Sequence, residues 1–241
     1  MTDLYSYCIP CDDGAAPNPF EGVCTLVICK PRIRRKAAVG DWIVGTGAKC
    51  ARIDKDRSED MSGRLVYAMQ VTEKMSMADY DAATKTRLPG KLPMWDSSAW
   101  WRKLGDSIYD YAGGATPTLR EPCVHAADNV ARDLSGRNAL LSTNFYYFGD
   151  KAIELPDNLR HIAPNQQGHR RQLNESFVDD FVKWINGLGY APCSVVGKPL
   201  YDPIVAEGSS GWGARWGASE RLADSVSNPH IVDDEPVETL D

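Results

Sequence analysis

A run of basic residues lies just ahead of an apolar segment in CKPRIRRKAAVGDWIVGTGAK, at residues 29–49. Guanidinium groups match the geometry of phosphate oxygens and bind them through paired hydrogen bonds. The run therefore predicts a phosphate-binding loop. The alternative is a solvated loop whose arginines pair with acidic residues elsewhere in the chain. The residues predicted to bind phosphate are Lys30, Arg32, Arg34 and Arg35.

The end of the apolar segment supplies further candidates, because glycines let a main chain approach a ligand closely. Thr46 and Gly47 can bind a phosphate through main-chain amides, although a tight turn explains the same residues. The residue order of a Walker motif is missing. His169 and Arg170 in QGHRR predict a second phosphate contact.

Aromatic residues are frequent in the middle of the chain, and aromatic rings stack on unpaired bases. Strand alternation puts successive rings of residues 145–148 on opposite faces, so at most half of them can line one site. The others belong to the core, and packing also explains each ring taken singly. The predicted base-stacking residues are Trp95, Trp101, Tyr109 and Tyr147.

Three residues are candidates for acid–base catalysis. His125 and Asp128 lie three residues apart in CVHAADN and can act together on one helical face, although this is also the spacing of an ordinary surface pair. Asp150 follows YYFG. The sequence has no Ser-His-Asp order, no H-E-x-x-H, no zinc deaminase signature and no Rossmann glycine signature. No motif therefore demonstrates catalysis.

The seven cysteines are scattered, which is typical of a reducing compartment. Cys8 and Cys11 form a C-x-x-C pair, which Cys24 and Cys29 can extend to four zinc ligands. If residues 23–28 form one strand, however, Cys24 and Cys29 point to opposite faces. We therefore predict no metal site and no cofactor, and Cys8 is equally explained as a small buried residue.

The net charge of −6 is unevenly distributed. Residues 30–57 contain nine basic and three acidic residues, a net charge of +6. Residues 206–241 contain eight acidic and two basic residues, a net charge of −6. A basic surface suits a nucleotide or nucleic acid as partner. The acidic tail can compete with phosphates for that surface, or bind a protein partner.

Short strands and a few helices must position these residues. Ser76 and Asp79 resemble a capping box and predict a helix to about residue 84. A second helix is predicted over residues 174–188, with Asn174 as its cap and Phe177, Phe181, Ile185 and Leu188 on one face. Apolar runs predict strands at 4–9, 22–28, 41–45, 65–71, 107–111, 139–141 and 144–148.

This order predicts an α+β domain over residues 1–190, with a small curved sheet or partly closed barrel. It resembles the PUA-like group, which includes the EVE, ASCH and YTH domains, at the level of topology. Residues 191–241 are predicted to be an acidic, flexible tail. The sequence shows no signal peptide and no membrane span, so we expect a soluble, cytoplasmic protein.

Four sequence blocks, taken together, resemble the nucleotide modification associated domain family, second type. They are DDGAAPNPF at 12–20, CTLVICKPRIRRKAAVGDWIVGTGAK at 24–49, GDSIYDY at 105–111 and NALLSTNFYYFGDKAIELP at 138–156. The resemblance covers about residues 3–190. It implies a place in bacterial or phage systems that make or handle modified nucleotides or bases, and it brings no established catalytic mechanism.

We predict a binding module that recognises a modified nucleotide or base, free or in nucleic acid, in a nucleic-acid modification or defence pathway. The alternative is an enzyme of the same pathway that uses His125, Asp128 and Asp150. A third function is a protein-interaction subunit that acts through its acidic tail.

Overall fold

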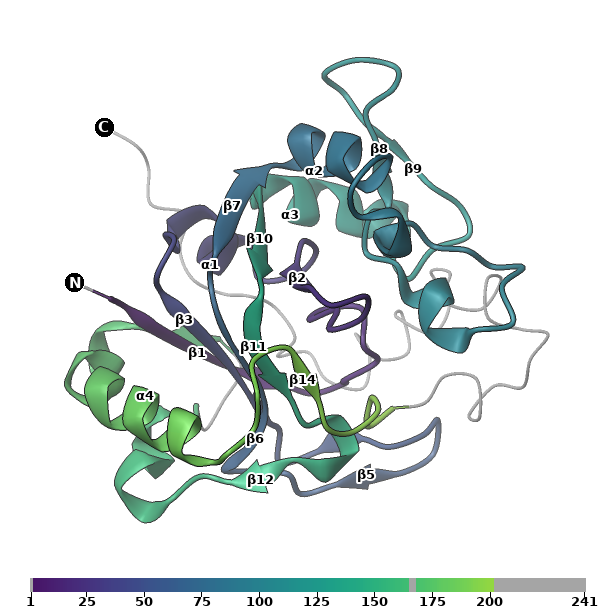
Figure 1. Ribbon diagram of the computed structural model, residues 1–241. Helices are drawn as coiled ribbons and strands as arrows, with labels where there is room; N and C mark the ends of the chain where they lie inside the picture. Colours follow the sequence, from purple (N-terminus) through teal and green to yellow (C-terminus); the bar gives the residue numbers. More distant parts are fainter. Residues whose placement is uncertain (1, 165–167, 202–241) are drawn as a thin grey trace.

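The strands of the computed structural model, which describes residues 2–164 and 168–201, form two main sheets (Figure 1). In the larger sheet, β1 is parallel to β3 and β11 to β14, and the other pairs are antiparallel. Its strand order is β13 (His169–Arg170), β1 (Leu4–Ile9), β3 (Trp42–Gly47), β6 (Arg64–Gln70), β11 (Asn144–Tyr147) and β14 (Ser194–Val195), and β12 (Ile153–Glu154) also pairs with β6.

The smaller sheet is antiparallel, with β10 between the other two strands. Its order is β2 (Cys24–Leu26), β10 (Asn138–Ser142) and β7 (Glu73–Ser76). Two short hairpins lie outside both sheets, and they pair β4 (Ala51–Arg52) with β5 (Ser58–Glu59) and β8 (Tyr109–Asp110) with β9 (Thr118–Leu119).

The helices are short and connect or cover these sheets. The α-helices are α1 (Pro31–Lys36), α2 (Met77–Thr84), α3 (Val130–Ser135) and α4 (Val178–Gly187). The 3₁₀ helices are η1 (Pro89–Lys91), η2 (Trp100–Leu104), η3 (Ala127–Asn129), η4 (Gly149–Lys151), η5 (Asp157–Ile162) and η6 (Gln172–Phe177).

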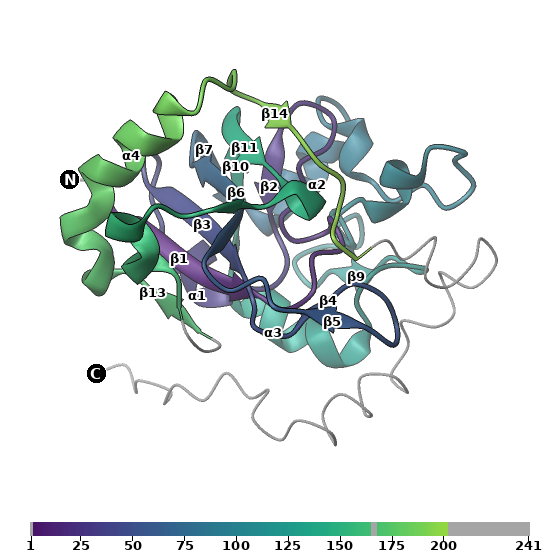
Figure 2. The same ribbon diagram turned by 90° about the horizontal axis from the view of Figure 1, so that it is seen from below.

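The larger sheet carries a hydrophobic core on each face. On one face, Phe181 and Ile185 of α4 pack against Trp42, and the rings of Trp42 and Phe181 meet edge to face. Figure 2 shows α4 along the outer side of β1, β3 and β6. On the other face, the sheet packs against Leu26 and Leu140 of the smaller sheet. The two sheets therefore pack face to face.

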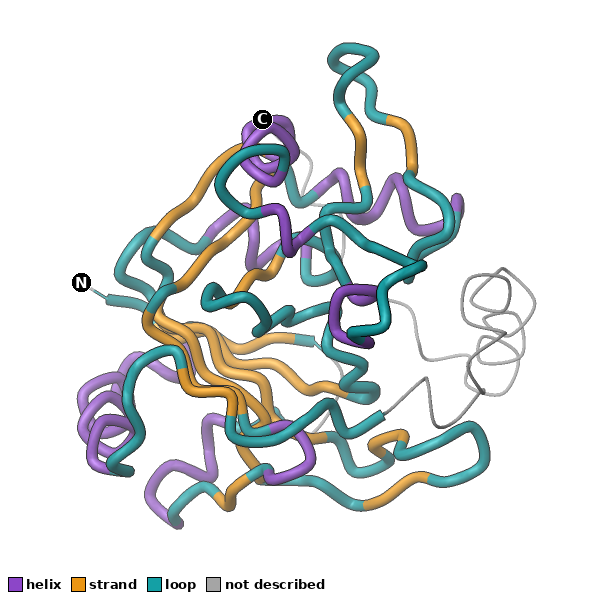
Figure 3. Tube along the Cα trace, turned by 45° about the vertical axis from the view of Figure 1, so that its right-hand side comes forward, coloured by secondary structure: helices purple, strands orange, loops and turns teal. Residues whose placement is uncertain are grey.

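A third core lies on the far side of the smaller sheet. Ala139 and Leu141 of β10 pack there with Met77 and Tyr80 of α2, whereas Leu140 between them faces the larger sheet. This alternation is the pattern of a strand buried on both faces. Figure 3 shows that loops and short helices make up much of the molecule on this side.

The α+β class predicted from the sequence is confirmed. Within residues 2–164 and 168–201 the sheets do not close into a barrel, and the PUA-like type stays a prediction. The cap at Ser76 is confirmed, because its side chain accepts a hydrogen bond from the N–H of Asp79. The last helix begins at Val178, and Asn174 does not cap it, since its amide binds the carbonyl of Leu4 instead.

The basic run is a helix and not the loop expected from the sequence. Pro31 stands in the first turn of α1, where its fixed φ favours a helix and its missing N–H costs nothing. Arg34, Arg35 and Lys36 occupy the last turn, where positive charge interacts favourably with the helix dipole. The basic residues thus help to form α1.

Residues 200–201, at the end of the described chain, pack against the segment that follows β1. Leu200 N donates to Asp12 Oδ2 at 3.3 Å, and buried Tyr201 donates from its N–H to the carbonyl of Asp12 at 2.9 Å. The predicted boundary between domain and tail at residue 190 stays a prediction, and residues 202–241 of the predicted tail lie outside the described residues.

No helix in the described part of the chain is long and apolar enough to cross a membrane.

Candidate active site

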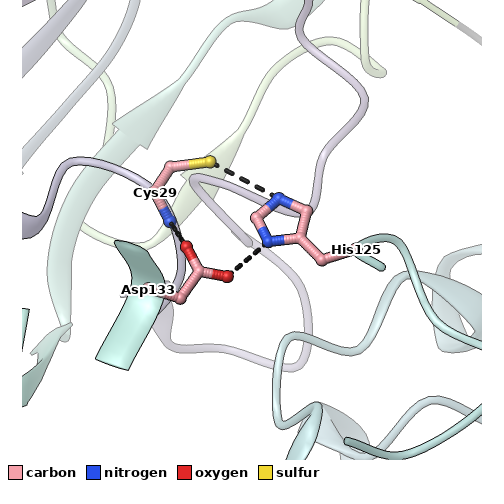
Figure 4. A group of neighbouring side chains, drawn as sticks. All are labelled: Cys29, His125 and Asp133. Atoms are coloured by element: carbon pink, nitrogen blue, oxygen red, sulfur yellow. Dashed lines mark hydrogen bonds and ion pairs between the residues drawn. The ribbon is translucent and has the colours of Figure 1, made fainter. Parts of the chain in front are cut away.

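Three side chains with complementary chemistry meet beyond the end of β2 (Figure 4). Cys29 Sγ lies 3.6 Å from His125 Nε2, and His125 Nδ1 lies 2.5 Å from Asp133 Oδ2. Cys29 stands between β2 and α1, His125 precedes η3, and Asp133 belongs to α3. The contacts combine a thiol, an imidazole and a carboxylate in the order that activates a nucleophile.

Cys29 lies in a sharp turn between a strand and a helix. Its φ is 57°, and Lys30, which caps α1, has a φ of 40°. Both values are left-handed and cost free energy in residues other than glycine. Such strain often accompanies functional residues, and a strained strand-to-helix turn is one way in which folds present a nucleophile.

Asp133 holds the other two residues in place. Its carboxylate accepts hydrogen bonds from His125, from Cys29 N at 2.9 Å and from the hydroxyl of Tyr109 at 2.8 Å. Burial acts to raise the pKa of Asp133, but the hydrogen bond and charge of His125 and these other donors leave it below its usual value. The carboxylate is therefore ionised at neutral pH.

The charge of His125 favours an ion pair with Cys29. Burial alone lowers the pKa of His125, but Cys29 and Asp133 outweigh burial and raise this pKa to about 10. At neutral pH the imidazole is thus protonated, and a positive charge beside a sulfur stabilises the thiolate. Cys29 is partly exposed, whereas the side chains of His125 and Asp133 are only 15% and 1% exposed. Cys29 and His125 are therefore both partly exposed, whereas Asp133 is buried behind them.

A metal ion is the competing explanation, because the ligand atoms of Cys29, His125 and Asp133 all lie within 4.8 Å of one another. To bind one metal ion, the Cys29 sulfur, an Asp133 carboxylate oxygen and a single ring nitrogen of His125 would all have to point toward the same position. Figure 4 shows the two on different ring nitrogens, Nε2 for Cys29 and Nδ1 for Asp133. This geometry fits a nucleophile, a base and an orienting acid better than a metal site.

Comparison with known proteins gives the family. The family model described as nucleotide modification associated domain 2 matches residues 1–205. The chain belongs to this family. No curated protein and no solved structure matches the chain. The match confirms the family recognised from the sequence blocks, and the family name implies a role in nucleotide modification pathways. Cys29, His125 and Asp133 all lie within the matched residues of this nucleotide modification associated domain.

The acid–base candidates of this nucleotide modification associated domain are separated in the fold. His125 is in the site, but its carboxylate partner is Asp133, while Asp128 is exposed. Asp150 is exposed at η4, where its Oδ1 accepts a hydrogen bond from Lys198 N at 3.0 Å. Neither Asp128 nor Asp150 belongs to the group around Cys29.

Sequence reasoning missed two of the three site residues. The sequence pattern indicates Cys29 only as a possible zinc ligand, and no pattern indicates Asp133. One signal was present, because Cys29 comes two residues before Pro31, at a position where a helix can start. Asp133 had no such signal, since its distance of eight residues from His125 matches no local motif.

The predicted phosphate-binding residues divide between surface and interior. Arg34 is buried and donates to main-chain carbonyls, so the structure corrects its assignment as a phosphate ligand. Thr46 is also buried, and a Cβ at Gly47 would meet Met61 at 2.3 Å, so this part of β3 serves packing. Lys30, Arg32 and Arg35 reach the surface to different extents.

The second predicted phosphate contact lies on the edge strand β13. The ring of His169 lies 6.5 Å from that of Tyr5, and Arg170 Nη1 donates to the carbonyl of His161 at 2.7 Å. Both residues are half-buried. This pair belongs to the larger sheet and has no described contact with Cys29.

The predicted stacking residues have different surroundings. Trp101 is 39% exposed, and Trp95 packs against the third core. Tyr147 is buried and its hydroxyl donates to Asp12 at 2.7 Å, so its ring is part of the core. Tyr109 is also buried, and it reaches the site through its hydroxyl and not through its ring face. Among these four residues, only Trp101 is well exposed.

Proposed function

We propose that this nucleotide modification associated domain is an enzyme whose Cys29 forms a covalent bond to an acyl-type group on a nucleotide or base. The observation that carries the proposal is the position of the His125 ring, with the Cys29 sulfur at one nitrogen and the Asp133 carboxylate at the other. Family membership supports the class of substrate.

The first half of the reaction uses the thiolate of Cys29. The sulfur attacks the carbonyl carbon of the substrate and forms a carbon–sulfur bond. The bond between this carbon and its leaving group then breaks, and the electron pair goes to the leaving group. His125 Nε2 gives its proton to the leaving group, so that a thioester on Cys29 and a neutral product result.

Water completes the cycle. His125 Nε2 takes a proton from water as the oxygen attacks the thioester carbon, and the electron pair of the carbon–sulfur bond returns to Cys29. A carboxylic acid is released, and the thiolate and the imidazolium are restored. Asp133 stays ionised throughout, because its task is to orient the ring and stabilise its positive charge.

The binding module favoured by the sequence is the second candidate. Lys30 follows Cys29 directly and its ammonium lies 4.7 Å from the centre of the Tyr7 ring, and Arg32 and Arg35 lie on α1, which begins two residues after Cys29. An enzyme and a binding module both need this charge to hold a phosphate-bearing ligand. The site around Cys29 favours the enzyme, because recognition alone does not require a His125–Asp133 pair.

Alkylation of Cys29 tests the proposal. The protein is treated with iodoacetamide at pH 6, and labelling of each cysteine is followed by peptide mass spectrometry. An ordinary thiol ionises near pH 8.5 and reacts slowly at pH 6. We expect Cys29 to react faster than exposed Cys50, and we expect His125→Gln to remove this advantage. A Cys29 that reacts no faster than Cys50 contradicts the enzyme.

Substrate chemistry is tested on the same protein. Incubation with nucleotides that carry an acylated base should leave an acyl adduct on the wild type and none on Cys29→Ser, as measured by intact mass. A nucleotide that slows the alkylation of Cys29, with no adduct and no product from any member of the panel, would favour the binding module.

A further inference from the structure

The buried guanidinium of Arg34 connects the main chains that carry Cys29 and Asp133. Its Nε donates to the carbonyl of Cys29 at 2.8 Å, and its Nη2 donates to the carbonyl of Asp133. Its Nη1 donates to the carbonyl of Asn138 at 3.0 Å. A guanidinium carries five N–H donors in one plane, so a single side chain can serve carbonyls in several directions.

The carbonyls that Arg34 binds come from different elements. Cys29 belongs to the turn before α1, Asp133 to α3, and Asn138 begins β10. The Asp133 carboxylate adds a second connection, since it accepts a hydrogen bond from Cys29 N at 2.9 Å. The nucleophile turn and the acid are thus linked twice, through the Arg34 side chain and through the Asp133 side chain.

The surrounding structure is shaped to hold this charge. A Cβ at Gly136 would lie 2.3 Å from both Cζ and Nη2 of Arg34, so the absence of a side chain at position 136 makes room for the guanidinium. Burying a charge is costly unless its hydrogen bonds are satisfied. Burial lowers the pKa of Arg34, and the neighbouring Asp133 counteracts this. The carbonyls that accept its hydrogen bonds and the nearby Asp133 offset the cost of burying this charge.

We infer that Arg34 is a positioning residue, which fixes the left-handed turn at Cys29 relative to Asp133 and so aligns the sulfur with His125. The inference rests on the proposed function, because without a nucleophile at Cys29 the same contacts would only brace a turn. A turn at a φ of 57° has to be held by its surroundings, and Arg34 binds the carbonyl of that very residue.

Arg34→Lys tests the inference, since lysine keeps the positive charge but loses the planar fork. The matched control is Arg132→Lys, the same change at an exposed residue of α3 next to Asp133. Two signals are measured: the iodoacetamide rate of Cys29 at pH 6 and the proton NMR resonance of His125 Nδ1–H, assigned by its loss in His125→Gln. Cooperative urea unfolding and circular dichroism confirm that each variant is folded.

We expect folded Arg34→Lys to lose at least tenfold in Cys29 alkylation rate and to broaden or shift the His125 resonance, while Arg132→Lys keeps both. Gly136→Ala displaces the guanidinium without removing it, and we expect a smaller loss of the same kind. A folded Arg34→Lys or Gly136→Ala with unchanged rate and unchanged resonance overturns the inference. Failure of both variants to fold also overturns it, because Arg34 would then have only a structural role.

The two proposals fail in different ways. If wild-type Cys29 reacts no faster than Cys50, the enzyme is contradicted, whatever the Arg34 variants do. If wild-type Cys29 is fast and folded Arg34→Lys is equally fast with an unchanged His125 resonance, only the positioning role is lost. In both cases the His125 resonance still reports whether Arg34 holds the ring against Asp133.

Discussion

Replacement of Asp133 by asparagine removes one charge from the site with little change in shape. The carboxylate accepts three hydrogen bonds, and the shortest, at 2.5 Å, comes from His125 Nδ1. An asparagine oriented with its nitrogen toward the ring cannot accept that bond, and in either orientation it carries no negative charge. The protonated ring is therefore less stable in the variant, and the thiolate of Cys29 loses part of its counter-charge.

The size of the effect follows from the type of hydrogen bond. A hydrogen bond to a charged group contributes about 1.5–3 kcal/mol. Because each 1.36 kcal/mol is a factor of ten, this free energy corresponds to roughly a 10- to 100-fold decrease in the alkylation rate of Cys29 at pH 6. The difference from wild type should shrink toward pH 9, where ordinary thiols ionise without help.

The assay is iodoacetamide labelling of wild type and Asp133→Asn at pH values from 6 to 9, with Cys50 as internal reference. His125 stays protonated up to about pH 10 in the wild type, so its positive charge is present over this whole range. The variant should instead show a rate that rises with pH, as an isolated thiol does. Equal rates and equal pH profiles in the two folded proteins would refute the triad.

Three further predictions follow from the same contacts. Tyr109→Phe removes a hydroxyl that donates to the triad carboxylate at 2.8 Å, so urea unfolding should show a loss of about 1–3 kcal/mol, and an unchanged midpoint would contradict this. The pKa of His125 is raised in the folded state, so its contribution to stability is complete below about pH 6.5 and is lost as pH rises toward 10. The difference in unfolding free energy between wild type and His125→Asn should shrink from pH 6 to pH 10, and a constant difference would exclude the raised pKa. Glutamate at Arg32 and Arg35 should weaken binding of an oligonucleotide duplex and flatten its salt dependence by about one unit of slope for each lost phosphate contact. A fluorescence titration with the same slope as wild type would show that these arginines bind no phosphate.

The strands that form the layers were the most predictable part of the fold. The strand predicted at residues 4–9 matches β1 (Leu4–Ile9), and the one at 65–71 nearly matches β6 (Arg64–Gln70), because apolar residues dominate both. The predicted strand at 22–28 shortens to Cys24–Leu26, since the chain must turn before Cys29. Local pattern therefore predicts where a strand lies better than where it ends.

The site was less predictable, because its residues come together only through the packing of distant elements. Cys29 and His125 are 96 residues apart in sequence, and no repeat or motif connects them. Spacing along the chain also favoured the wrong acid, because Asp128 lies nearer to His125 in sequence than Asp133 does. The turn between β2 and α1 contacts α3 in the fold, and this contact brings Asp133 to Cys29 and His125.

The basic run shows how a helix changes the meaning of a charge pattern. Successive residues of an α-helix are rotated by about 100°, so Arg32 and Arg35 share one side of α1 while Arg34 points to the opposite side. The structure agrees, because Arg34 is buried and Arg35 is exposed. One side of the helix thus holds the turn at Cys29, and the other presents positive charge.

A helix of six residues is about 9 Å long, so a phosphate bound to the outer side of α1 would lie within a nucleotide's length of the thiol. If Cys29 is the nucleophile that we propose, this proximity is a reason to search for its substrate among nucleotides that carry their acyl group close to a phosphate.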